Sequence, residues 1–223
     1  MIQASTAKPA PKLYLLTNDD EFAVLYPKLE AALATGLIAL LQIRRKKTLQ
    51  SANGAAELYN EAAQIVSLAK SHHVPVVIND DIELAKKLGV GVHLGQQDGD
   101  IDDAKCHLKP EQTIGRTCHG DVDLVTEAKK EGASYAAMGA IFASNTKPNA
   151  NVISRQQLID GCQQGIDICV IGGLSPENIT EFSGLPIAYV AVVGDVMDLP
   201  VHQIAARCQQ WQQALDAWYA PAR

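Results

Sequence analysis

Short runs of apolar residues recur along the chain, and most of them are too short to form helices. Several are rich in valine and isoleucine, which favour strands. We therefore predict eight strands, of which the fifth is the weakest, at residues 13–16, 37–43, 74–78, 90–94, 112–115, 134–139, 166–173 and 187–194.

Helical patterns fill the intervals between the predicted strands. Phe22, Leu25, Leu29 and Leu33 recur at helical spacing, and Gly36 ends that segment. Further helices are predicted over 52–72, 81–89, 123–132 and 202–218.

Regular alternation of strand and helix in a chain of 223 residues predicts a (β/α)₈ barrel, the TIM barrel, in a single domain. We place this domain at residues 13–223, after a loose tail over 1–12. A doubly wound open sheet is the alternative. The first strand is followed by "LLTNDD", which lacks the G-x-G-x-x-G of dinucleotide-binding sheets.

Composition narrows the classes of partner. The net charge of −6 argues against a general binder of nucleic acids or anionic membranes, although a local basic pocket remains compatible with it. The five cysteines form no C-x-x-C pair, which indicates reduced thiols. No apolar run reaches the ~20 residues of a membrane span, and the first residues do not resemble a signal peptide. We therefore predict a cytoplasmic protein.

In such a barrel the active site lies at the C-terminal ends of the strands, so the polar residues there are candidates. After the third strand, "VVINDD" places Asn79, Asp80 and Asp81 in a row. We expect Asp81 to cap the next helix, which leaves Asp80 to face the barrel mouth. Asp98 follows the fourth strand and could share a Mg²⁺ ion with Asp80. His93 is interpreted as a buried core residue.

Basic side chains follow the second strand. Gln42, Arg44 and Lys46 alternate and would share one face of an extended chain, with Ile43 and Arg45 on the other. This face suits phosphate oxygens, but a solvated basic turn explains it equally well.

Later strand ends carry hydroxyl groups and glycines. In "GRTCHG", Thr117 offers a hydroxyl group and His119 could act as a base. Cys118 could be a thiol nucleophile, but nothing else in the sequence supports that role. "FASNTKP" is a cluster suited to phosphate. "IGG" and "VVG" end the last two strands, where loops often form a phosphate cup from backbone N–H groups. Ser175 and Pro176 are predicted to begin a short helix aimed at the same place.

These motifs together resemble the thiamine phosphate synthase family. "QIRRK", "VVINDD", "GVHLGQQD", "FASNTKP" and "VIGGLSPENI" occur in the order and spacing of that family, over nearly the whole chain after the tail. The resemblance implies a barrel that joins an aminopyrimidine diphosphate to a thiazole phosphate and releases pyrophosphate.

The resemblance also implies roles for particular residues. The diphosphate would be held by Gln42, Arg44, Lys46, Asn79 and Lys147. Mg²⁺ would be bound by Asp80 and Asp98. Thr117 stands at a position where the family usually has serine. The thiazole phosphate would be held by Ser144, Thr146, Gly173, Val193 and Gly194. Among these, Arg44, Lys46, Lys147 and Thr117 are the expected catalytic residues.

Some positions depart from the family pattern. Gly194 replaces a serine and is followed by Asp195, a carboxylate that must point away from a phosphate cup. Arg116 replaces a small apolar residue, and Ala143 a proline. Two other functions stay open: an isomerase resembling thiazole tautomerase, with His119 as its base, and a non-catalytic barrel that binds a phosphate ligand. The sequence leaves open whether the chain forms a homo-oligomer.

Overall fold

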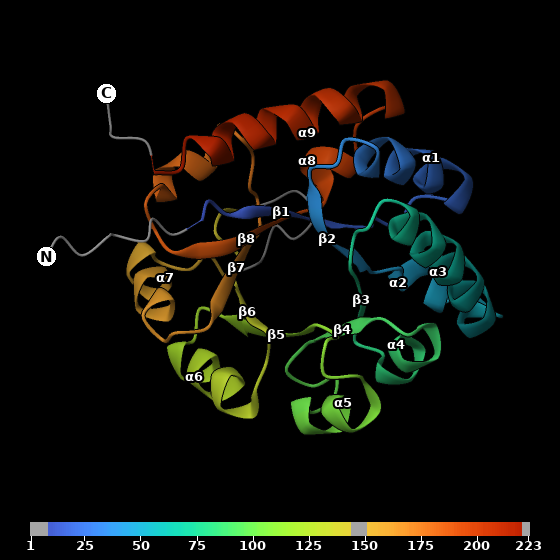
Figure 1. Ribbon diagram of the computed structural model, residues 1–223, viewed down its shortest axis with the longest axis horizontal. Coiled ribbons are helices and arrows are strands. Elements are labelled where there is room, and N and C mark those ends of the chain that lie inside the picture. The colour runs from blue at the N-terminus through green and yellow to red at the C-terminus, as the bar shows by residue number, and fades with distance from the viewer. Residues whose placement is uncertain (1–8, 144–150, 220–223) are drawn as a thin grey trace, which may run out of the picture.

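Eight parallel strands close into a barrel with helices around the outside (Figure 1). This computed structural model describes residues 9–143 and 151–219. Each strand pairs with the next along the chain, and β8 pairs with β1, so the predicted (β/α)₈ barrel is confirmed. The strands are β1 (Lys12–Leu16), β2 (Ile38–Ile43), β3 (Val76–Asn79), β4 (Gly91–Leu94), β5 (Ile114–His119), β6 (Tyr135–Met138), β7 (Asp167–Ile171) and β8 (Ile187–Val192).

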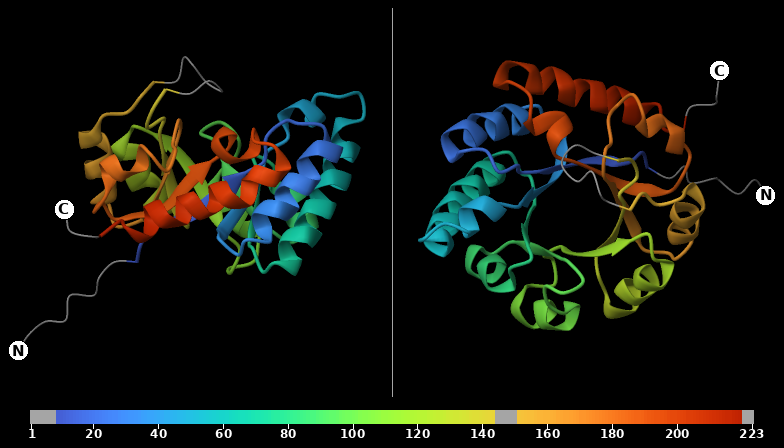
Figure 2. Two further views of the ribbon diagram at one scale, coloured as in Figure 1. Left: turned by 90° about the horizontal axis from the view of Figure 1, so that it is seen from above. Right: turned by 180° about the vertical axis from the view of Figure 1, so that it is seen from behind.

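The helices lie outside the ring of strands, seen from the front in Figure 1 and from behind in Figure 2, right. They are α1 (Phe22–Leu33), α2 (Lys46–Leu49), α3 (Gly54–Ser71), α4 (Ile82–Leu88), α5 (Ile101–His107), α6 (Val122–Glu131), α7 (Arg155–Cys162), α8 (Gly194–Met197) and α9 (Val201–Asp216), with a 3₁₀ helix η1 at Ile179–Phe182.

Alternation along the strands sorts the side chains into two layers. Outward-facing residues such as Leu15, Leu41 and Val92 join the helices in one large apolar core. The inward-facing residues form a second, smaller cluster that includes Tyr14, Leu16, Leu40, Val77, Tyr135, Ala137, Cys169 and Ala191. The barrel interior is therefore filled with side chains.

Local signals position the helices. Asp81 caps α4 as predicted, because its side chain accepts a hydrogen bond from the Leu84 N–H at 2.8 Å. Asp121 caps α6 in the same way. Gly89 and Gly132 end these helices in the left-handed conformation, which glycine adopts at little cost.

Several predicted boundaries were wrong. β5 continues to His119, so Arg116, Thr117 and Cys118 lie within a strand and do not follow one. β8 stops at Val192, and Gly194 begins α8. No helix begins at Ser175: a turn there leads to η1, and the Asn178 side chain accepts from the Ser175 N–H.

Burial explains the behaviour of the cysteines. No disulfide forms among the described residues, and Cys118, Cys169 and Cys208 are buried. Burial raises the pKa of Cys118 to about 12 and that of Cys208 to about 11. These thiols therefore stay protonated at neutral pH.

Within residues 9–143 and 151–219, no helix is both long and apolar enough to cross a lipid bilayer.

Candidate active site

The parallel closed barrel brings all strand C-termini to one rim, and Asp80 lies there directly after β3. Its backbone has φ of +64°, a left-handed conformation that aspartate tolerates better than most residues. Asp80 Oδ1 accepts a hydrogen bond from the Gly95 N–H at 3.0 Å, and Oδ2 accepts one from Asn79 Nδ2 at 2.5 Å. The carboxylate is therefore fixed between the ends of β3 and β4, as the sequence predicted for a residue facing the mouth.

Asp98 lies in the loop after β4, close to Asp80. A Cβ built at Gly95 would clash with Asp98 Oδ2 and would lie 3.5 Å from Asp80 Oδ1, so both carboxylates occupy the same side of this glycine. The Asp98 N–H donates to the Gly95 carbonyl at 3.3 Å. Two neighbouring carboxylates at the strand ends are a donor set that suits Mg²⁺, which usually adds water and substrate phosphate oxygens. No cluster of three or more metal-binding side chains occurs in the described part of the chain.

Arg116 braces the loop that carries Asp98. Its guanidinium donates to the carbonyls of Gly95 at 3.0 Å and Gly99 at 2.7 Å. Gly95 thus connects three groups: its N–H holds Asp80, and its carbonyl receives both Asp98 and Arg116. The arginine that departs from the family pattern therefore organises the candidate metal site.

The basic residues after β2 point to different sides of the chain. Arg45 is buried and forms an ion pair with Glu61 on α3 at 2.9 Å. Lys46 lies on the opposite side, with its ammonium 3.8 Å from Asp80 Oδ2. Lys46 begins α2 and is not on extended chain, which corrects the predicted geometry without moving the side chain away from the rim. The Arg44 side chain has no hydrogen bond or ion pair with any described residue.

A line of hydrogen bonds crosses the barrel interior just below this rim. Gln42 Nε2 lies 2.6 Å from the Tyr14 hydroxyl, which lies 2.8 Å from the Tyr135 hydroxyl. The Tyr135 hydroxyl lies 2.8 Å from His93 Nδ1, and His93 Nε2 lies 2.9 Å from Thr117 Oγ1. His93 is buried with both nitrogens partnered, which confirms its interpretation as a core residue. Burial lowers its pKa to about 4, so the ring is neutral at pH 7.

The ends of β7 and β8 approach the place expected for the phosphate cup. Gly173 has φ of +63°, and a Cβ there would lie 2.7 Å from the Ala143 carbonyl oxygen. The loop after β6 therefore packs directly on Gly173. Val193 precedes α8 and Gly194 begins it. Ser144, Thr146 and Lys147, predicted from "FASNTKP", lie outside the described residues.

Asp195 points away from the candidate cup, into α9. Arg207 binds its carboxylate at 2.6 and 3.0 Å, and Trp211 Nε1 donates to it at 2.7 Å. Arg207 also contacts both oxygens of Glu177, in the loop after β7, at 2.7 and 2.9 Å. These contacts lower the pKa of Glu177 to about 2. One arginine therefore ties the β7 loop to α8.

The residues needed by the alternative chemistries are poorly placed. Cys118 is fully buried, and its raised pKa leaves it without nucleophilic thiolate. His119 ends β5 with its side chain exposed, and its ring forms no hydrogen bond with a described residue. No described group orients it as a base.

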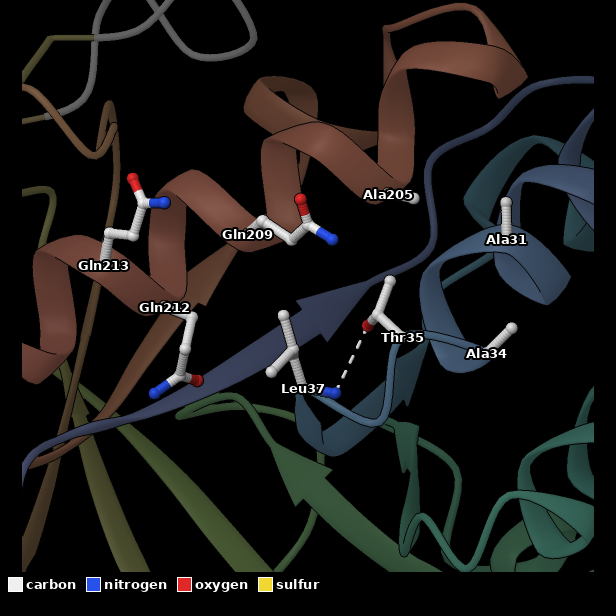
Figure 3. A pocket seen from close by; sticks show the side chains of 8 residues that line it. All are labelled: Ala31, Ala34, Thr35, Leu37, Ala205, Gln209, Gln212 and Gln213. Carbon is white, nitrogen blue, oxygen red and sulfur yellow. Dashed lines mark hydrogen bonds between the residues drawn. The ribbon is translucent and has the colours of Figure 1, made fainter.

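A separate groove lies between α1 and α9 (Figure 3). It is beside the start of β2, and therefore at the opposite end of the barrel from the rim. Its lining carries no charge and consists of Ala31, Ala34, Thr35, Leu37, Ala205, Gln209, Gln212 and Gln213. Without cations or carboxylates it is unsuited to phosphates or metal ions.

Sequence reasoning missed three contributors to the site. Tyr14 and Tyr135 looked like ordinary strand residues, and their hydroxyls meet although they are 121 positions apart. Arg207 lies in the helix predicted over 202–218, and no partner was predicted for it. Arg116, by contrast, carried a signal in the sequence, because it departs from the family pattern.

Comparison with known proteins agrees with this geometry. The model of the family described as "Thiamine monophosphate synthase" matches residues 13–196. A thiamine-phosphate synthase of Chromobacterium violaceum is 35% identical over 209 residues, which cover 93% of this chain and 95% of the relative.

Solved structures share the fold. A thiamine phosphate pyrophosphorylase from Pyrococcus furiosus superposes with a TM-score of 0.76 at 23% identity, covering 92% of this chain and 95% of that one. A 3-hexulose-6-phosphate synthase from Salmonella typhimurium gives a TM-score of 0.71 at 16% identity, covering 93% and 100% of the two chains. The sequence match spans most of the barrel and includes the rim described above. The chain therefore belongs to the thiamine monophosphate synthase family.

Proposed function

We propose that this chain couples an aminopyrimidine diphosphate to a thiazole phosphate, giving thiamine phosphate and pyrophosphate in a Mg²⁺-dependent reaction. Its assignment as a thiamine phosphate synthase, a transferase, rests on the family match and on the relative from Chromobacterium violaceum. The observation that carries the proposal is the convergence of Lys46, Asp80 and Asp98 around Gly95 at the strand ends. We expect the protein to work in the cytoplasm.

The rim supplies what departure of a diphosphate requires. Asp80 and Asp98 would hold Mg²⁺, which when bound neutralises negative charge on the leaving pyrophosphate. Lys46 lies close enough to Asp80 to share that region, and Arg44 has a guanidinium without a protein partner among the described residues. Gln42, Asn79 and Lys147 complete the proposed diphosphate contacts. These groups stabilise charge that grows as the bond breaks, so they accelerate the reaction.

The bonds made and broken balance without a protein nucleophile. The C–O bond between the pyrimidine methylene and the diphosphate breaks, and its electron pair leaves with pyrophosphate. The electron-rich pyrimidine ring carries the positive charge, and the thiazole nitrogen then gives its lone pair to form the C–N bond. The protein's part is to orient the two substrates and to neutralise the leaving group.

The second substrate would lie toward β7 and β8. Gly173, Val193 and Gly194 offer backbone N–H groups, and Ser144 and Thr146 are proposed to add hydroxyls. The outward orientation of Asp195 supports this arrangement, because the carboxylate is held by Arg207 and Trp211 and does not repel a phosphate.

The test is a coupling assay with purified protein, both substrates and Mg²⁺, following thiamine phosphate and pyrophosphate together. Asp80→Ala should abolish most product, as should chelation of the metal. Asp81→Ser is the matched control: it removes a neighbouring carboxylate but keeps a residue that can cap α4, so activity should persist. Product formation that ignores both Asp80→Ala and chelation would refute the metal-dependent mechanism.

A further inference from the structure

The buried line of hydrogen bonds from Gln42 to Thr117 connects two proposed substrate-binding residues through three side chains that touch no substrate in the proposed mechanism. Its members come from β2, β1, β6, β4 and β5, so the line spans the interior of the barrel. Tyr14, Tyr135 and His93 are all buried. Each of their polar atoms must find its partner within this line, because an unpaired buried group is costly.

The direction of each hydrogen bond follows from the first. The Gln42 amide nitrogen can only donate, so the Tyr14 oxygen accepts from it at 2.6 Å. The Tyr14 hydrogen then goes to the Tyr135 oxygen, its other neighbour, at 2.8 Å. The Tyr135 hydrogen has His93 Nδ1 as its remaining partner, also at 2.8 Å. Nδ1 is therefore an acceptor and carries no hydrogen.

The tautomer of His93 determines what Thr117 presents to the active site. A neutral imidazole without hydrogen on Nδ1 carries it on Nε2, which donates to Thr117 Oγ1 at 2.9 Å. Because Thr117 Oγ1 accepts this bond, its own hydrogen stays available for another acceptor. The side chain is only half-buried, at the rim, where an anionic oxygen of the substrate can reach it.

We infer that Tyr14, Tyr135 and His93 are positioning residues that polarise this line in one direction and present the Thr117 hydroxyl as a hydrogen-bond donor to an anionic oxygen of the substrate. Aligned donors in a buried chain strengthen one another, so the last hydroxyl is a better donor than an isolated threonine. The role of Thr117 toward substrate rests on the proposed function, whereas the direction of the line does not.

The fold reserves space for this line. Gly115 lies on β5 opposite Tyr135, and a Cβ there would overlap the tyrosine ring and come within 2.6 Å of His93 Nδ1. Any larger residue would separate Tyr135 from His93. The Tyr135 and His93 rings also stack, with centroids 5.6 Å apart and planes 17° from parallel, which holds the imidazole in place.

The first test is the tautomer itself, read by ¹⁵N NMR of protein labelled on histidine, without substrate. The His93 signals are assigned by their loss in His93→Gln. We expect hydrogen on Nε2 and none on Nδ1. Hydrogen on Nδ1 would mean that the Gln42 amide is reversed and every bond in the line runs the other way. That result, or a mixture of the two tautomers, would overturn the inference whatever the activity.

The second test uses a matched pair of tyrosine variants. Tyr135→Phe removes the hydroxyl that binds Nδ1, and it should convert His93 to a detectable mixture of tautomers. Tyr189→Phe is the control, because this ring belongs to the same cluster, 5.8 Å from Tyr135, but its hydroxyl has no hydrogen bond to a described residue. It should leave the tautomer and kcat/KM unchanged. An unaltered His93 tautomer in Tyr135→Phe would contradict the proposal that the Tyr135 hydroxyl sets this tautomer.

The third test connects the line to the reaction. Thr117→Val should lower kcat/KM by about 10- to 100-fold, as expected for loss of a hydrogen bond to a charged group. Thr117→Ser keeps a hydroxyl and should lose less activity than Thr117→Val. Tyr135→Phe should lose a smaller factor, and adding it to Thr117→Val should cost little more, since both act through one hydroxyl. Fully multiplicative effects would refute the coupling. A wild-type protein without coupling activity would refute the proposed function and leave the tautomer result to decide the direction of the line.

Discussion

Replacing Gly115 with alanine should destabilise the protein although it adds a single methyl group. The new Cβ would overlap Cζ and the hydroxyl oxygen of Tyr135 and would lie 2.6 Å from His93 Nδ1. Neither neighbour has a free direction in which to move, because both rings are buried and hydrogen-bonded. The substitution therefore forces the two rings apart.

Two costs add in this variant. Overpacking a buried site typically costs about 1–3 kcal/mol of folding free energy. Breaking the bond between Tyr135 and His93 leaves buried polar atoms without partners, which costs about 1–3 kcal/mol more. We expect Gly115→Ala to lower the free energy of unfolding by about 2–6 kcal/mol.

Guanidinium denaturation measures this loss as a shift of the midpoint at an unchanged slope. The informative comparison is the double variant with Tyr135→Phe, which removes the hydroxyl oxygen that the new methyl group overlaps. Its cost should be smaller than the sum of the two single costs by about 1 kcal/mol or more. A loss below about 0.5 kcal/mol for Gly115→Ala, or strictly additive costs, would show that the interior is looser than the contacts indicate.

Three other predictions follow from contacts near the rim. Arg116→Gln should raise the Mg²⁺ concentration needed for half-maximal activity by about tenfold, because loss of charged hydrogen bonds to two loop carbonyls frees Asp98; metal titration of the coupling assay checks this. Arg207→Met should raise KM for the thiazole phosphate more than it lowers kcat, because it removes the contacts that join the β7 loop to α8. Steady-state kinetics of this variant, compared with those of Arg207→Lys, check this expectation. For His93, the pKa is about 4 in the folded state and about 6.5 unfolded. The unfolded chain therefore takes up a proton first as the pH falls. The stability contributed by neutral His93 is complete above pH 6.5 and is lost toward pH 4, by up to about 3 kcal/mol. Denaturation midpoints across this range should show a steeper loss than in His93→Gln.

The architecture could be predicted because it repeats. Eight apolar runs separated by helical patterns leave few alternatives, and each error fell where local signals are weak. β5 was placed too early because "GRTCHG" contains little apolar material, although Thr117 and Arg116 have polar partners on the two sides of the strand. Such residues alternate between the two sides of a strand as strand residues do, but they lack the apolar side chains by which a strand is usually recognised.

The site could be predicted in part, and distance along the chain explains the rest. Asp80, Asp98 and Lys46 follow consecutive strands, so the topology alone brings them to one rim. The contacts of Tyr14 with Tyr135 have no local signature, because they join opposite parts of the barrel. The partner of Asp195 lies on the helix that follows it, and no local pattern indicates that Arg207 binds this carboxylate.

The pairing of β1 with β8 has a consequence for how this protein is made. The seam joins Leu13 to Val190, so the barrel closes only after nearly the whole chain has left the ribosome. Until then β1 and β7 each present an open row of backbone N–H and C=O groups, which other chains can pair with. Contacts so distant in sequence also form slowly, because a long loop must close before they contribute. A chain that stops before β8 should therefore aggregate, and the interval between synthesis of β7 and of β8 is the period in which the nascent protein most needs protection by chaperones.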